Sequence, residues 1–166
     1  MKRIAFSLLF FFTFFALMAL TGFKSSPIRM PRESTAIECS KLPLAEDPWK
    51  ASQLLAPADL ANTINDPKAP QPLIFCIGPG AVIKNSIDIG PARDTLNLEK
   101  FKLQLSKLPK DAPIVIYCGC CPFEHCPNIR PAFTLLNNMK FTRHKLLNIE
   151  HNVKTDWIGK GYPSVP

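Results

Sequence analysis

Apolar residues in this chain fall into short continuous runs and into stretches with helical spacing. Residues 73–77, 114–117 and 145–149 are largely apolar and are bounded by proline, glycine or polar residues, a pattern typical of strands buried in a sheet. Two shorter apolar runs, at 81–83 and 86–89, adjoin turn-forming residues and predict short strands.

Helical spacing is clearest where Leu98, Phe101, Leu105 and Leu108 recur with mostly polar residues between them. This pattern predicts an amphipathic helix that ends before Pro109. Helices are also predicted at 57–64, 129–139 and 155–160. Strands that alternate with helices predict an α/β domain whose mostly parallel central sheet is flanked by helices.

Residues 1–23 form a separate unit of the sequence. Lys2 and Arg3 precede a long apolar run without charged residues. Such a start is typical of an export signal, and the run is also long enough to remain as a single membrane anchor. Both interpretations place the rest of the chain outside the cytoplasm, in the periplasm or anchored to a membrane and facing the periplasm. Residues 24–48 are rich in proline, serine and charge and predict an irregular arm or linker, so we expect one domain over 49–166.

The charge of the chain narrows the classes of partner. The formal net charge is +7, and it falls to +5 if residues 1–23 are removed together with Lys2 and Arg3. The remaining basic residues are scattered and do not interleave with aromatic residues, so nucleic-acid binding is not expected. The positive excess favours a small anionic substrate. A membrane is an expected partner only if residues 1–23 are retained.

Four of the six cysteines lie in one loop, YCGCCPFEHCPNIRPA, which joins the strand predicted at 114–117 to the helix predicted at 129–139. A small disulfide-stapled fold would spread its cysteines along the chain. Amide groups that converge at a helix N-terminus stabilise a thiolate and lower the pKa of a cysteine there, so the loop predicts a reactive thiol. By contrast, Cys76 lies in an apolar strand and is expected in the core, and Cys39 is either free or paired outside the loop.

Three segments resemble a rhodanese-like domain. Residues 83–92 resemble the family's GHIPGA segment, residues 108–118 (LPKDAPIVIYC) its approach to the active-site cysteine, and residues 146–165 its closing strand, tryptophan turn and GYP ending. The resemblance implies a sulfurtransferase in which Cys118 takes sulfane sulfur from a small anionic donor and holds it as a persulfide, without a cofactor. A thiol or cyanide would then accept the sulfur. Arg130 would complete the site by holding either the loop or the anionic substrate.

Two features depart from the family pattern. The Asp-x-Arg that the family usually carries on its first buried strand is replaced by FCIG at 75–78. Cys118 and Arg130 enclose eleven residues instead of a few, which resembles a subgroup with the pattern YCGCCP…CPNIRPA. Since loop length sets the size of the anion-binding cradle, the identity of the substrate stays open.

The other loop residues are candidates for substrate binding or for shaping the loop: Gly119, Cys120, Cys121, His125, Cys126 and Asn128. Cys126 is either a resolving thiol for Cys118 or Cys121, or half of a permanent disulfide that braces the loop. A bond between the adjacent Cys120 and Cys121 would be strained. His125 lowers the pKa of a neighbouring thiol, binds a metal, or is simply an exposed loop residue.

In a purely structural interpretation, the Arg130 guanidinium either pairs with an acidic residue such as Glu124 or points into solvent. The loop thiols and His125 are enough for a soft metal such as Cu(I) or zinc, but the paired C-x2-C spacing of zinc knuckles is absent and no metal is predicted.

The sequence leaves two alternatives to the sulfurtransferase. One is a thiol–disulfide oxidoreductase that uses the loop cysteines, and the other is a non-catalytic module that binds a metal or a partner.

Overall fold

The computed structural model describes residues 46–165. The segment predicted as a signal or anchor, 1–23, and most of the predicted arm at 24–48 lie outside these residues, as does Cys39. Among the helices of the described part, none has the length and apolar character needed to span a bilayer.

Five strands form one sheet in the order β1-β5-β4-β2-β3, and every strand pairing is parallel. The strands are β1 (Leu54–Leu55), β2 (Leu73–Cys76), β3 (Ser86–Asp88), β4 (Ile114–Tyr117) and β5 (His144–Leu147). The α/β class with a mostly parallel sheet, predicted from the alternation of apolar runs and helices, is confirmed. β4 is the central strand, with two strands on each side of it.

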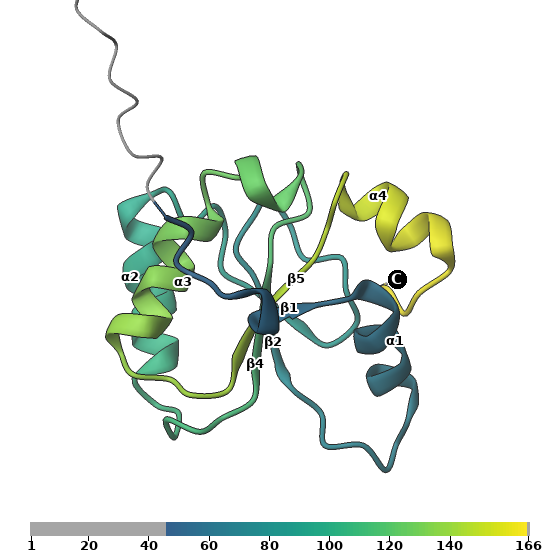
Figure 1. Ribbon diagram of the computed structural model, residues 1–166, viewed down its shortest axis with the longest axis horizontal. Coiled ribbons are helices and arrows are strands. Elements are labelled where there is room, and N and C mark those ends of the chain that lie inside the picture. The colour runs from purple at the N-terminus through teal and green to yellow at the C-terminus, as the bar shows by residue number, and fades with distance from the viewer. Residues whose placement is uncertain (1–45, 166) are drawn as a thin grey trace, which may run out of the picture. The chain divides into compact units, whose positions relative to one another are not determined.

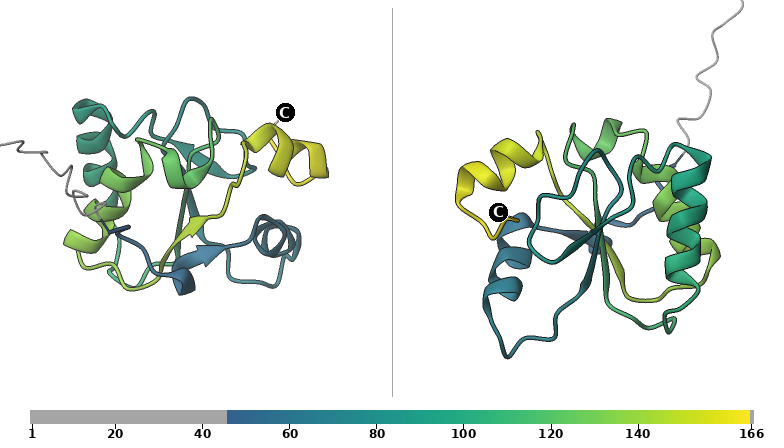
Figure 2. Two further views of the ribbon diagram at one scale, coloured as in Figure 1. Left: turned by 45° about the horizontal axis from the view of Figure 1, so that its top comes forward. Right: turned by 180° about the vertical axis from the view of Figure 1, so that it is seen from behind.

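Helices cover both faces of the sheet, which gives three layers (Figures 1 and 2). The helices are α1 (Pro57–Asn65), α2 (Thr95–Leu105), α3 (Ile129–Asn138) and α4 (Val153–Asp156). Short 3-10 turns lie at η1 (Ala51–Gln53), η2 (Phe123–His125) and η3 (Ile158–Lys160). α2 and α3 lie side by side on one face, and α1 and α4 lie on the other (Figure 2).

Side chains of β4 alternate between the two cores. Ile114 and Ile116 pack in the core under α2 and α3, whereas Val115 and Tyr117 pack in the core under α1 and α4. Because successive side chains of a strand point to opposite faces, Cys118 continues the first series and enters the α2–α3 core. A strand buried on both faces explains the unbroken apolar run in the sequence.

Cys118 follows β4 at the point where the connections of two adjacent strands diverge. β2 leads through residues 77–85 to β3 on one side, whereas β4 leads through α3 to β5 on the other. Open α/β sheets bind ligands at the carboxyl ends of strands at such a switch point. Gly78 lies against Cys118 there, and a Cβ atom on Gly78 would be only 2.6 Å from the Cys118 Sγ.

The boundaries of some elements differ from those predicted. The run at 81–83 forms no strand, and only Ile83 makes an isolated antiparallel bridge, with Ser164. The helix predicted at 98–108 begins at Thr95 and ends at Leu105. Its first turn was missed because Leu96 is exposed and does not belong to the apolar spacing of the buried face. The final helix begins two residues before the predicted position, because the Asn152 side chain accepts from the Thr155 N–H at the start of α4. It divides into α4 and η3 at Trp157, whose backbone is not helical.

Candidate active site

The cysteine loop, residues 118–128, is tied to the segment that follows β5 at two points. The Val153 N–H at the start of α4 donates to the Gly119 carbonyl oxygen (2.9 Å), and the Phe123 N–H donates to the Ile149 carbonyl oxygen (2.9 Å). A Cβ atom on Gly119 would lie 2.7 Å from a methyl carbon of Val153, so only glycine permits this approach. The loop is therefore held in place from outside the cysteine cluster.

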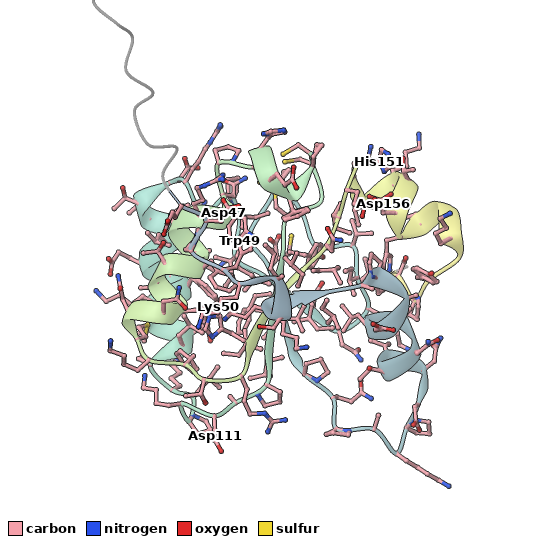
Figure 3. All side chains as sticks on the ribbon, in the orientation of Figure 1. Asp47, Trp49, Lys50, Asp111, His151 and Asp156 are labelled. Atoms are coloured by element: carbon pink, nitrogen blue, oxygen red, sulfur yellow. The ribbon has the colours of Figure 1, made fainter. Side chains whose placement is uncertain are left out.

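A pair of polar residues supports the α4 end of this attachment. The His151 N–H donates to one carboxylate oxygen of Asp156 (2.7 Å), and the His151 ring lies 3.0 Å from the other oxygen. The two side chains lie together beside the first turn of α4 (Figure 3). Their contact fixes the turn that presents the Val153 N–H to the loop.

The Cys118 sulfur is buried and is surrounded by hydrogen-bond donors. The Asn128 side-chain amide donates to it (3.5 Å), and the Cys120 Sγ lies 3.3 Å away. The pKa of Cys118 is lowered from an ordinary value of 9.0 to about 5, and the Cys126 thiol is the largest cause of this decrease. The Cys120 N–H and the Asn128 amide lower the pKa further, whereas burial raises it. Cys118 is therefore a thiolate at neutral pH.

Three sulfur atoms converge at this point. The Sγ atoms of Cys118, Cys120 and Cys126 all lie within 4.8 Å of one another, and the Cys121 Sγ lies 3.4 Å from that of Cys120. Cys118 and Cys126 are buried, whereas Cys120 is exposed. None of the cysteines in residues 46–165 forms a disulfide. Among the described residues, Cys126 is therefore a free thiol, and both roles considered for it from the sequence stay predictions.

The thiols around Cys118 stay protonated. Donation of its proton to Cys118 raises the pKa of the Cys126 thiol, and burial adds to this. Partial desolvation of the Cys120 sulfur, together with its hydrogen bonds to Cys118 and Cys121, raises the pKa of Cys120 to about 12. The cluster therefore holds one negative charge on Cys118, with neighbouring thiols as donors.

Asn128 connects Cys118 to a residue that the sequence did not indicate. Asn128 is only 4% exposed, and its side-chain oxygen accepts from the Arg93 N–H (3.1 Å) while its amide faces the Cys118 sulfur. The Arg93 side chain is largely exposed and lies 3.8 Å from the Asp94 carboxylate. The contact joins residues 35 positions apart, so no local pattern could have revealed it.

Arg130 does not join the thiol cluster. Its guanidinium donates to the Glu124 carbonyl oxygen (2.8 Å), pairs with the Asp47 carboxylate and lies over the Trp49 ring, 5.3 Å from its centroid. Asp47 and Trp49 lie together beside α3 (Figure 3). Of the roles expected for Arg130, the structure thus shows it holding the loop. Its carboxylate partner is Asp47 rather than Glu124.

His125 is exposed at the end of η2 and lies outside the group of converging ligand atoms. Within the described part of the chain, that group consists of Cys118, Cys120 and Cys126. Three thiolates at this separation are a donor set that suits a soft metal ion such as Cu(I). A structural zinc site would need a fourth ligand.

Cys76 and Tyr117 lie on the opposite face of the sheet from the cluster. The Cys76 thiol donates to the Gly80 carbonyl oxygen (3.2 Å), and burial raises its pKa, as expected for a core residue. The Tyr117 hydroxyl accepts from the N–H groups of Val82 (2.9 Å) and Ile83 (3.2 Å), and burial raises its pKa to about 12. Tyr117 therefore anchors the 77–85 connection rather than the thiols.

The surroundings of the loop are unequal in charge. A cavity of about 290 Å³ beside η2 is lined by Glu124 and Glu150 and by no basic residue. A larger cavity, of about 550 Å³, contains Arg143 and Lys145 but lies at the opposite edge of the sheet, where β4 and β5 begin. The acidic lining beside η2 disfavours the approach of an anion from that side, whereas Arg93 offers an exposed positive charge 3.8 Å from the Asp94 carboxylate.

No protein-family model matches the chain, and no curated protein matches it either. The chemical interpretation of the site therefore depends on its geometry.

Proposed function

We propose that the protein is a rhodanese-like sulfurtransferase that carries sulfane sulfur as a persulfide on Cys118. The observation that carries the proposal is the position of the Cys118 sulfur. It lies at the carboxyl end of the central strand, with the Cys120 thiol and the Asn128 amide within hydrogen-bond distance and the Cys126 sulfur within 4.8 Å. Donors arranged in this way stabilise an anionic sulfur, whether thiolate or persulfide, without a cofactor.

The proposed reaction has two steps. The Cys118 thiolate attacks the sulfane sulfur of a thiosulfate-type donor, the donor's sulfur–sulfur bond breaks, and sulfite leaves with the bonding electrons. Cys118 then bears a persulfide whose charge lies on the outer sulfur. A thiolate or cyanide attacks that outer sulfur, and the Cys118 thiolate is restored.

The proposal is tested by measuring thiosulfate-dependent transfer to cyanide in the Cys118→Ser and Cys76→Ala variants. We expect Cys118→Ser to lose transfer and Cys76→Ala to keep it, since Cys76 is a buried thiol on the opposite face of the sheet. Mass spectrometry of the Cys120→Ser variant, which lacks the thiol that lies 3.3 Å from the Cys118 sulfur, should show one added sulfur atom on the peptide that contains Cys118 after exposure to thiosulfate. Transfer that survives in Cys118→Ser would exclude this residue as the carrier.

A second candidate, a thiol–disulfide oxidoreductase, is favoured by the 3.3 Å separation between the Cys118 and Cys120 sulfur atoms. It predicts a reversible two-electron couple and exchange with a dithiol in the absence of any sulfane sulfur. It also predicts that thiosulfate leaves the reduced protein unmodified. The mass spectrum described above therefore separates the two candidates.

A further inference from the structure

A persulfide on Cys118 would not be isolated from other thiols. The Cys120 Sγ already lies 3.3 Å from the Cys118 Sγ, and the Cys126 Sγ completes a group within 4.8 Å. A neighbouring thiol can attack the inner sulfur of a persulfide, which forms a disulfide and expels sulfide. The cluster therefore contains the second reactant of a release step, in addition to the carrier.

Cys120 is better placed for this step than the other thiols. It is exposed, whereas Cys126 is fully buried and a disulfide between Cys126 and Cys118 would be closed to an external reductant. Cys121 contacts Cys120, but its sulfur lies outside the group of three that surrounds the Cys118 sulfur. The accessible partner of Cys118 is thus Cys120.

We infer that Cys120 attacks the Cys118 persulfide, forms a disulfide with Cys118 and releases the transferred sulfur as the hydrosulfide ion. The site would then act as a sulfane-sulfur reductase. The Cys120 proton passes to the charged outer sulfur of the persulfide, and the Cys120 thiolate formed in this way bonds to the Cys118 sulfur. The bond from Cys118 to the outer sulfur breaks, and that sulfur leaves as the hydrosulfide ion with the proton and the bonding electrons. The sulfane sulfur gains two electrons, and the two cysteines lose them. This inference rests on the proposed function, because it begins from the persulfide.

The resulting disulfide must be reduced before the next cycle, and we assign this step to an external dithiol. The dithiol is oxidised to its own disulfide, and Cys118 and Cys120 return to the thiolate and thiol. A disulfide across the single residue Gly119 would be strained and exposed at Cys120. Strained or exposed disulfides are the ones that cycle readily, which suits a catalytic intermediate.

The test uses the full chain, fully reduced, freed of small thiols and kept anaerobic, with thiosulfate as the donor. In the wild type we expect sulfite, about one equivalent of sulfide and a Cys118–Cys120 disulfide from a single loading. In Cys120→Ser we expect sulfite, a lasting persulfide on Cys118, and sulfide at about one tenth of the wild-type amount or less. Cys76→Ala, which removes a buried thiol on the opposite face of the sheet, is the matched control and should release sulfide like the wild type.

The outcomes separate the two proposals. Sulfite with a lasting persulfide and no sulfide in the wild type would overturn the release step and leave the sulfurtransferase standing. Undiminished release in Cys120→Ser, with loss in Cys126→Ser, would overturn the assignment to Cys120. If neither sulfite nor persulfide forms in any variant, the sulfurtransferase fails, and the release step fails with it.

Discussion

Replacing Cys126 tests whether the thiol cluster produces the reactive thiolate. The Cys126 side chain is fully buried, and its thiol is the largest contribution to the lowered pKa of Cys118. Cys126→Ala removes this donor and leaves Asn128 and the Cys120 N–H in place. Cys126→Ser is the matched control, because its hydroxyl can still donate to the Cys118 sulfur.

The size of the effect follows from the strength of the lost hydrogen bond. A hydrogen bond to a charged group contributes about 1.5–3 kcal/mol, and one pKa unit corresponds to about 1.4 kcal/mol. The pKa of Cys118 should therefore rise by about 1–2 units in Cys126→Ala, from about 5 in the wild type. At pH 6 the thiolate fraction would fall by about two- to tenfold.

The assay is the pH dependence of Cys118 alkylation by iodoacetamide, followed by mass spectrometry of the loop peptide. The thiolate is the reactive form, so the rate rises with pH through the pKa and is constant above it. The wild type should reach half of its plateau rate near pH 5, and Cys126→Ala at a higher pH. The midpoint is the quantity to compare, because a thiolate of higher pKa is intrinsically more nucleophilic and raises the plateau.

The reasoning would be refuted if Cys126→Ala kept the wild-type midpoint while folding normally. The same holds if Cys126→Ser shifted the midpoint as far as Cys126→Ala. An unchanged midpoint in Cys126→Ala would assign the low pKa of Cys118 to Asn128 and to the N–H and thiol of Cys120. An equal shift in both variants would show that Cys126 acts through its packing rather than through a donated hydrogen bond.

Three further predictions concern the surroundings of the thiol. Gly78→Ala places a Cβ atom 2.6 Å from the nucleophilic sulfur, so transfer activity should fall at least about tenfold, and unchanged activity would contradict the close approach. Arg93→Ala should raise the KM for thiosulfate about two- to fivefold at low salt and by less at high salt. The control Arg143→Ala should leave the KM unchanged. An unaltered KM in Arg93→Ala would exclude electrostatic attraction of the substrate by this residue. Arg130→Ala should lower the free energy of unfolding, measured with urea, by about 1–2 kcal/mol. A double-mutant cycle with Asp47→Ala should give a coupling energy of about 0.5 kcal/mol or more between the two side chains. Strictly additive effects would show that this ion pair does not contribute to stability.

Much of the fold could be predicted because its strands are buried on both faces. Residues 73–77 and 114–117 are almost entirely apolar and lie between turn residues, and the structure places β2 and β4 there. β1 has only two residues and could not be recognised, because its place in the sheet comes from pairing with β5. A strand that short has no periodicity of its own.

The candidate site was predictable in part. The concentration of cysteines after an apolar strand indicates a reactive thiol at Cys118, whose burial and donors follow from β4 leading into the core. The contributions of Gly78 and Arg93 were missed, because each reaches the site from a different connection of the sheet. Contacts of that kind depend on how distant segments pack.

The sequence by itself determined the α/β class, the buried central strand and the chemical type of the loop, because apolar periodicity and residue chemistry are local properties. Only the tertiary structure decided which thiols meet and what Arg130 does. It brings the sulfur atoms of Cys118, Cys120 and Cys126 within 4.8 Å of one another and turns Arg130 away to Asp47 and Trp49. The path of a loop depends on hydrogen bonds to distant segments, here to Val153 and Ile149, and those contacts exist only once the sheet and its helices have packed.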